Sequence, residues 1–182
     1  MRFKFFFTLL VLASVSGVEA LGQKYITESG TVSFFSYALI ENIDATNSRI
    51  TSIFDADNGN LVYSIPIKHF EFDKSLMKEH FNENYLESEK FPKSIFKGKL
   101  EGFQKKDGSQ EVRAIGELLI HGVTKHVEIP GTIEMQEGKV IINAKFIIAV
   151  ADYEVEIPSL LFQNIAEKVE VTLNINYKLY EK

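Results

Sequence analysis

Short segments in which apolar and polar residues alternate run along most of the chain, and the last is the clearest. From Val169 to Leu179, aliphatic and tyrosine side chains alternate with charged, hydroxyl and amide side chains. A period of two places the apolar side chains on one face of a β-strand. The same reasoning predicts strands at residues 31–37, 48–54, 61–67, 94–103, 111–120, 124–133 and 139–150.

Turn-forming residues stand between several of these strands. Segments 57–60, 106–109 and 137–138 each contain a glycine beside aspartate, asparagine, glutamate or serine. Such residues supply the positive φ angles that tight hairpins need, so consecutive strands are expected to pair antiparallel. The sequence therefore predicts an all-β fold, an antiparallel β-barrel of about eight strands or a sandwich. A barrel is favoured because closure removes exposed edges, and eight strands can enclose one slender ligand.

Residues 73–86 break the alternation and predict one short amphipathic helix. Their apolar residues recur at helical spacing, and we expect Asp73 to cap the first turn and Phe72 to pack on Met77. Pro92 ends any continuation. As the chain's one such helix, it is expected to cover one mouth of the barrel and line the ligand entrance, rather than merely plug it.

The first twenty residues have the layout of a secretory signal peptide. Arg2 and Lys4 precede an apolar run from Phe5 to about Val15, and small residues lead to Ala20. The run is shorter than the ~20 residues that cross a bilayer. We expect cleavage after Ala20, a mature domain over residues 21–182 without a membrane span, and a periplasmic or secreted location.

Composition narrows the function. The chain has 182 residues, a formal net charge of −5 and no cysteine. An acidic chain is a poor ligand for phosphate backbones, so no nucleic-acid partner is expected. The lack of cysteine removes disulfides, thiolate catalysis and cysteine-bound metals.

Catalytic chemistry is also hard to place. His121 and His126 are an odd number of residues apart, which places them on opposite faces unless a turn at Gly122 intervenes, and no three histidines converge as metal ligands. Neither a nucleophile elbow nor a metalloprotease helix occurs. The carboxylates that follow the helix, Glu83, Glu87 and Glu89, are expected on a solvated face. We therefore predict no catalytic residue, no metal site and no cofactor.

Phenylalanine is abundant in the mature chain, and the simplest interpretation is that these rings fill the core. Composition alone does not separate a solidly packed barrel from one that encloses a ligand cavity. The residues concerned are Phe34, Phe35, Phe70, Phe72, Phe81, Phe96, Phe103, Phe146 and Phe162.

Three stretches resemble the YceI-like family, in the same order along the chain. They are residues 80–86 (HFNENYL), residues 90–96 with Lys90-Phe91-Pro92 and Ile95-Phe96, and residues 118–125 (LLIHGVTK). Segments 146–158 and 169–180 are also similar, so the likeness spans the mature chain. It departs from the family at 28–31 and 37–38, where the family often has histidines.

The resemblance implies a non-catalytic, lipocalin-like barrel whose apolar tunnel holds an isoprenoid lipid, either a polyisoprenoid or an isoprenoid quinone. A polar head group would lie at the mouth near His80, Asn84 or Tyr85. The alternative is a solidly packed structural or interaction protein, and an enzyme that uses the carboxylates after the helix is the third. The oligomeric state stays open, a dimer included. The implied ligand-binding residues are Phe34, Phe72, Met77, His80, Phe81, Tyr85, Phe96, Leu118, Phe146, Ile148, Leu173 and Tyr177.

Overall fold

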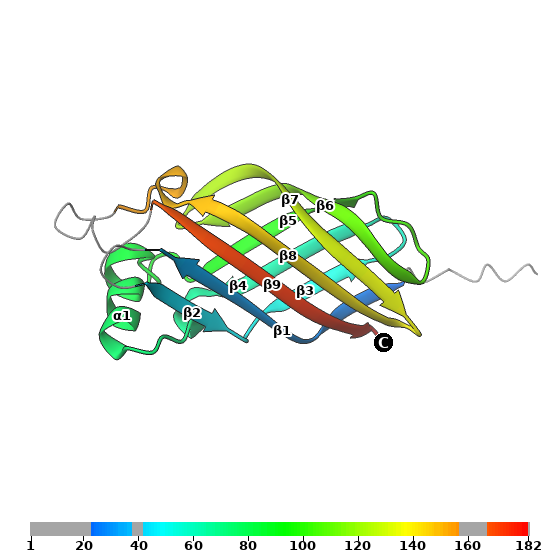
Figure 1. Ribbon diagram of the computed structural model, residues 1–182, viewed down its shortest axis with the longest axis horizontal. Helices are drawn as coiled ribbons and strands as arrows, with labels where there is room; N and C mark the ends of the chain where they lie inside the picture. Colours follow the sequence, from blue (N-terminus) through cyan, green and yellow to red (C-terminus); the bar gives the residue numbers. More distant parts are fainter. Residues whose placement is uncertain (1–22, 38–41, 157–166, 182) are drawn as a thin grey trace, which may run out of the picture.

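The computed structural model describes residues 23–37, 42–156 and 167–181, and these form one antiparallel sheet that closes into a barrel (Figure 1). The predicted signal peptide and Phe162 lie outside the described residues. The strands are β1 (Lys24–Ser36), β2 (Ile43–Asn47), β3 (Thr51–Asp55), β4 (Asn60–Pro66), β5 (Lys93–Glu101), β6 (Gly108–Ile120), β7 (Val123–Gln136), β8 (Lys139–Ala149) and β9 (Lys168–Leu179).

Closure depends on β1, which pairs with β9 along one edge, from Tyr25 opposite Leu179 to Ser36 opposite Val169. Its other edge pairs with β2 near one end and with β3 near the other. The nine described strands therefore occupy eight positions around the barrel, because β2 and β3 share one. This confirms the predicted all-β barrel of about eight strands.

The strand boundaries agree with the alternation pattern to within a few residues, but two pieces were missed. One is β2, which has only five residues. The other is the first half of β1, where the register shifts between Thr27 and Ser29, which breaks the period of two. The predicted turns are confirmed: Gly59, Gly108 and Gly138 have φ angles of 77°, 100° and 79°.

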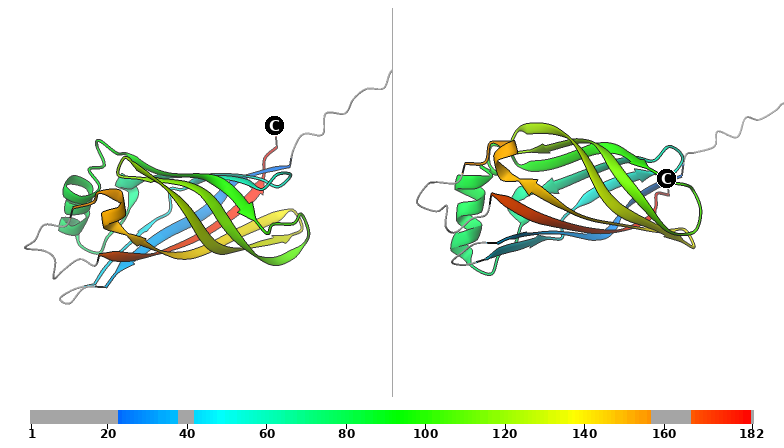
Figure 2. Two further views of the ribbon diagram at one scale, coloured as in Figure 1. Left: turned by 90° about the horizontal axis from the view of Figure 1, so that it is seen from above. Right: turned by 45° about the horizontal axis from the view of Figure 1, so that its top comes forward.

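The predicted helix is present but differs in detail. It consists of α1 (Ser75–His80) and a π-helical turn, η2 (Phe81–Tyr85), and it lies across one end of the barrel (Figures 1 and 2). Two further short helical turns are η1 (Ile67–His69) and η3 (Val150–Tyr153). The helix begins one residue later than expected, so Asp73 does not cap it. Lys74 occupies the N-cap position, and its side chain forms no capping hydrogen bond.

Leu76, one of the apolar residues of the predicted helix, is 59% exposed. Successive residues of a helix are rotated by about 100°, so a helix that turns Met77 toward the barrel directs Leu76 to solvent.

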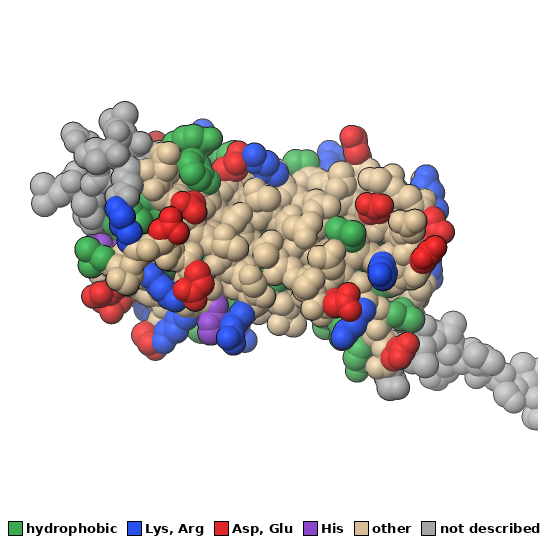
Figure 3. All heavy atoms as spheres, turned by 60° about the horizontal axis from the view of Figure 1, so that its bottom comes forward, with side chains coloured by type: hydrophobic (Ala, Val, Ile, Leu, Met, Phe, Trp, Pro, Cys, Tyr) green, Lys and Arg blue, Asp and Glu red, His purple; other side chains and the backbone are tan. Residues whose placement is uncertain are grey.

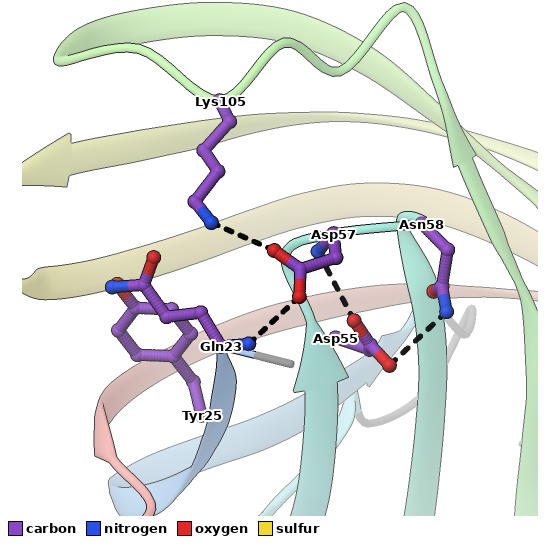
Figure 4. Close-up of polar contacts among 6 residues, drawn as sticks. All are labelled: Gln23, Tyr25, Asp55, Asp57, Asn58 and Lys105. Atoms are coloured by element: carbon purple, nitrogen blue, oxygen red, sulfur yellow. Dashed lines mark hydrogen bonds and ion pairs between the residues drawn. The ribbon is translucent and has the colours of Figure 1, made fainter. Parts of the chain in front are cut away.

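At the opposite end of the barrel, polar contacts join the start of β1 to two loops (Figure 4). The carboxylate of Asp57, in the β3–β4 turn, accepts hydrogen bonds from the backbone amide of Gln23 (2.9 Å) and from the ammonium of Lys105 (2.7 Å). These bonds hold the pKa of Asp57 below its usual value, with the Lys105 contribution the larger. The side-chain amide nitrogen of Gln23, Nε2, donates a hydrogen bond to the Tyr25 hydroxyl at 2.8 Å. The start of β1 and two loops are thereby joined.

Candidate functional site

An apolar cavity of about 380 Å³ occupies the barrel interior between the helical end and the middle. Its size falls within the ~300–1,000 Å³ typical of small-molecule sites. Alternate residues of the strands form its walls, because every second side chain of a barrel strand faces inward. On β9 these are Val169, Val171 and Leu173, while Thr172 between them is exposed.

Four phenylalanine rings from three parts of the chain pack together at the helical end of the cavity. Phe81 of η2 stacks on Phe34 of β1 with ring centroids 5.4 Å apart. It also packs against Phe70 (5.5 Å) and Phe72 (5.0 Å), which follow η1. Aromatic pairs at such distances contribute about 0.5–1.5 kcal/mol beyond area burial, so the cluster fixes η2 onto the barrel.

Polar groups are few along the walls. At the helical end, His80 and Tyr85 line the cavity, and burial raises the pKa of the Tyr85 phenol. Asn84, suggested as a contact for a head group, is exposed and is not among the lining residues. The sequence thus located two of three polar candidates at this end.

Deeper in the barrel, the hydroxyl of Tyr63 is buried and has no hydrogen-bond partner among the described residues. Burial, followed by the nearby Tyr177, raises the pKa of the Tyr63 phenol well above its usual value. The hydroxyl of Ser52 donates to the Val62 carbonyl and lies 2.7 Å from the Tyr177 hydroxyl. Tyr63 is therefore one of the few polar groups in a mainly apolar wall.

Eleven of the twelve ligand-binding residues predicted from the sequence line this cavity, and their contact with a ligand stays a prediction. They are Phe34, Phe72, Met77, His80, Phe81, Tyr85, Phe96, Leu118, Phe146, Ile148 and Leu173.

The twelfth, Tyr177, is not among the residues that line the cavity. It faces inward and is only 1% exposed, but it lies beyond the cavity, bonded to Ser52. Alternation identifies the face of a strand and not the depth along the barrel axis. Phe70 and Tyr63, which the predicted set omitted, do line the cavity. The available signal for Tyr63 was its alternation with Leu61 and Ile65, which places all three on one face of the strand.

Within the described part of the chain, no group of three or more histidine, aspartate and glutamate side chains is placed to hold a metal ion. His126 is an exposed partner of Glu117 at 3.2 Å. His121 and Gly122 form the turn between β6 and β7, which is the turn that the sequence had left open. None of the described helices is long and apolar enough to cross a membrane.

A closed antiparallel barrel with an apolar interior and a helix at one end defines a lipocalin-like barrel protein. The chain belongs to the YceI-like domain family, whose model matches residues 24–177. A search among curated proteins finds no matching sequence.

Solved structures share this fold at low identity. A polyisoprenoid-binding domain from Saccharophagus degradans, implicated in plant cell wall breakdown, has a TM-score of 0.74 at 12% identity, covering 86% of this chain and 98% of that one. Burkholderia cenocepacia BcnA has a TM-score of 0.69 at 14% identity, covering 81% and 95%. The Campylobacter jejuni YceI protein has a TM-score of 0.52 at 15% identity, covering 100% and 94%.

Proposed function

We propose that this protein binds an apolar isoprenoid chain, a polyisoprenoid or an isoprenoid quinone, inside the barrel and carries or sequesters it in an aqueous compartment without chemical conversion. The observation that carries the proposal is the apolar cavity of about 380 Å³ in the barrel interior. An apolar cavity is costly to maintain empty because its lining forgoes packing contacts.

The energetics suit a hydrocarbon ligand. Each buried methylene contributes about 0.8 kcal/mol, so a few five-carbon units offset an association cost of about 4–15 kcal/mol. Affinity would then depend on the shape and length of the chain. Membership of the YceI-like family and the likeness in fold to a domain described as polyisoprenoid-binding support the same assignment.

The two alternatives have less support. A solidly packed structural protein does not account for the cavity. An enzyme that uses the carboxylates after the helix does not account for their positions, since Glu83 is exposed, Glu87 bonds to His121, and Glu89 pairs with Lys68. On the face drawn in Figure 3, basic and acidic side chains are interspersed, so that face offers no extended region of one charge to a partner.

The proposed compartment is the periplasm or the exterior of the cell. It rests on the signal-peptide pattern of residues 1–20. A carrier for an insoluble chain is useful in an aqueous space beside a membrane.

Organic extraction and mass spectrometry of protein purified from its native envelope test the proposal. We expect a stoichiometric isoprenoid in the wild-type protein and in Thr172→Trp, whose new ring would lie outside the barrel. Val171→Trp fills the cavity from the neighbouring position and should lack the lipid while remaining folded by circular dichroism. A wild-type extract without any apolar molecule, together with no retention of added geranylgeraniol, would refute lipid binding.

A further inference from the structure

The barrel wall is incomplete between β7 and β8. These strands are paired over six residues each, from Gln136 opposite Lys139 to Gly131 opposite Ala144. In contrast, β7 is paired with β6 over thirteen residues and β8 with β9 over ten. Beyond Gly131 and Ala144 the two strands diverge toward the helical end (Figures 1 and 2).

The residue at the divergence explains why pairing stops there. Two-residue turns at 121–122 and 137–138 place hydrogen-bonded pairs next to each turn, and such pairs alternate along an antiparallel ladder. Counting from either turn, the backbone amides of the even-numbered residues of β7 point to β8. Residue 130 is the next of these beyond Thr132. That residue is Pro130, which has no amide hydrogen, so the ladder ends one residue earlier, between Gly131 and Ala144.

At this divergence the interior cavity and a groove on the outer surface are lined by some of the same residues. A groove on the outside of the barrel, which includes Arg113, Thr132 and Lys145, shares five lining residues with the cavity. The shared residues are Val112, Gly131, Asn143, Ala144 and Leu173.

Side-chain burial changes at the same level. Below the divergence, the inward residues Ile133 and Val140 are fully buried. Beside and above it, the inward residues Ala144, Phe146 and Ile148 are only half-buried.

The wide end of the divergence is filled by η3, which contacts both strands. Tyr153 of this turn is 3% exposed, and Val155 after it is buried. The opening is therefore bounded by Gly131 and Ala144 on one side and by η3 on the other.

We propose that this divergence is a side opening through which the apolar ligand enters and leaves the cavity, an inference that rests on the function proposed above. At the helical end four phenylalanine rings pack against one another, whereas the β7–β8 opening is bordered by strand edges without a ladder between them. Exchange through the side leaves the helix and its ring cluster in place.

Bridging the opening tests this route, and the lack of native cysteine makes thiol chemistry specific. Glu128→Cys and Ile147→Cys, at outward-facing exposed positions above Pro130, are joined with bis-maleimidoethane after loading with radiolabelled geranylgeraniol. The control pair is Glu134→Cys and Ile141→Cys, register partners on the same strands below the opening. Release to methyl-β-cyclodextrin is then followed.

We expect the bridge above Pro130 to slow release at least tenfold and the control bridge to change it less than twofold. Equal release from both bridged proteins would overturn the side opening and leave the helical end as the route. Pro130→Val restores an amide aimed at β8; it should protect that amide from hydrogen exchange and slow release about threefold. A protected amide with unchanged release would also contradict the proposal.

A measurement without lipid separates this inference from the proposed function. If no variant retains geranylgeraniol, the function fails for that ligand, and the opening is judged by the reaction of N-octylmaleimide with Ala144→Cys. This thiol should react at least tenfold faster than Val140→Cys on the same strand, and more slowly when Pro130→Val is added. Equal rates for Ala144→Cys with and without Pro130→Val would overturn the opening.

Discussion

The imidazole of His121 lies 2.8 Å from the carboxylate of Glu87, measured from Nε2 to Oε2. Its other nitrogen, Nδ1, is 3.2 Å from the carbonyl oxygen of Tyr153, and the ring of Phe91 packs against it at 4.6 Å. Both ring nitrogens therefore lie within hydrogen-bond distance of an oxygen atom from another segment of the chain. One side chain thus joins the segment after η2, the β6–β7 turn and η3.

A double-mutant cycle measures this link. Glu87→Ala removes the carboxylate, and His121→Asn removes the ring while keeping a residue type that tolerates the positive φ of 50° found there. Because Glu87 is 40% exposed, we expect a coupling free energy of only about 1 kcal/mol from denaturant unfolding of the four proteins. Additive losses would show that the two residues contribute independently.

Adjacent residues of β9 test the assignment of its faces. Leu173 is 8% exposed and lines the cavity, whereas Thr172 is exposed. Leu173→Arg should cost several kcal/mol because it places an unpaired charge in an apolar wall, and Thr172→Arg should change stability by about 0.5 kcal/mol or less. Equal shifts in denaturant midpoint would show that the faces are reversed or that the strand is not packed as described.

Phe81→Ala distinguishes a plug from a portal at the helical end. Phe81 packs on three other rings, so its truncation should reduce stability by about 3 kcal/mol, as large-to-small core changes do. If the helix is a plug, the Phe81→Ala substitution leaves the rate of geranylgeraniol release from the folded fraction unchanged. Faster release with little loss of stability would instead identify the helix as the portal that the sequence favoured.

Tyr63→Phe should stabilise the ligand-free protein by about 1 kcal/mol at neutral pH, because it removes a buried hydroxyl without a partner. The variant should also lose less stability in alkali. Burial raises the folded-state pKa of both Tyr63 and Tyr177, so each keeps a proton that the unfolded chain releases above pH ~10.

The contribution of such a tyrosine to the free energy of unfolding is fully present below pH ~10, the unfolded-state pKa. It falls by about 1.4 kcal/mol per pH unit between that value and the folded-state pKa. The Tyr63→Phe variant carries one such group fewer than the wild-type protein. Denaturant unfolding at pH 8 and pH 11 compares them, and identical alkaline losses would argue against a raised Tyr63 pKa.

The export prediction is checked by N-terminal sequencing of the protein from the soluble envelope fraction. Cleavage after Ala20 should give Leu21 as the first residue. An intact Met1 in that fraction would contradict it.

Alternation predicted most of the barrel because inward and outward positions differ in hydrophobicity along each strand. It identified Leu173 and Tyr177 as inward but not their depth, since depth depends on strand tilt and on where the helix sits. The incomplete wall had one visible signal: a proline inside a strand is confined to an edge, and Pro130 lies within the predicted strand 124–133.

The seam between β1 and β9 also constrains the order of folding. It joins the first and last strands of the barrel, with Tyr25 opposite Leu179, so the barrel closes only after nearly the whole chain is available. Contacts so distant in sequence slow folding because a large loop must close before they form. A polypeptide emerging from the ribosome would stay open until its last strand appears, which is the state that a secretory channel accepts.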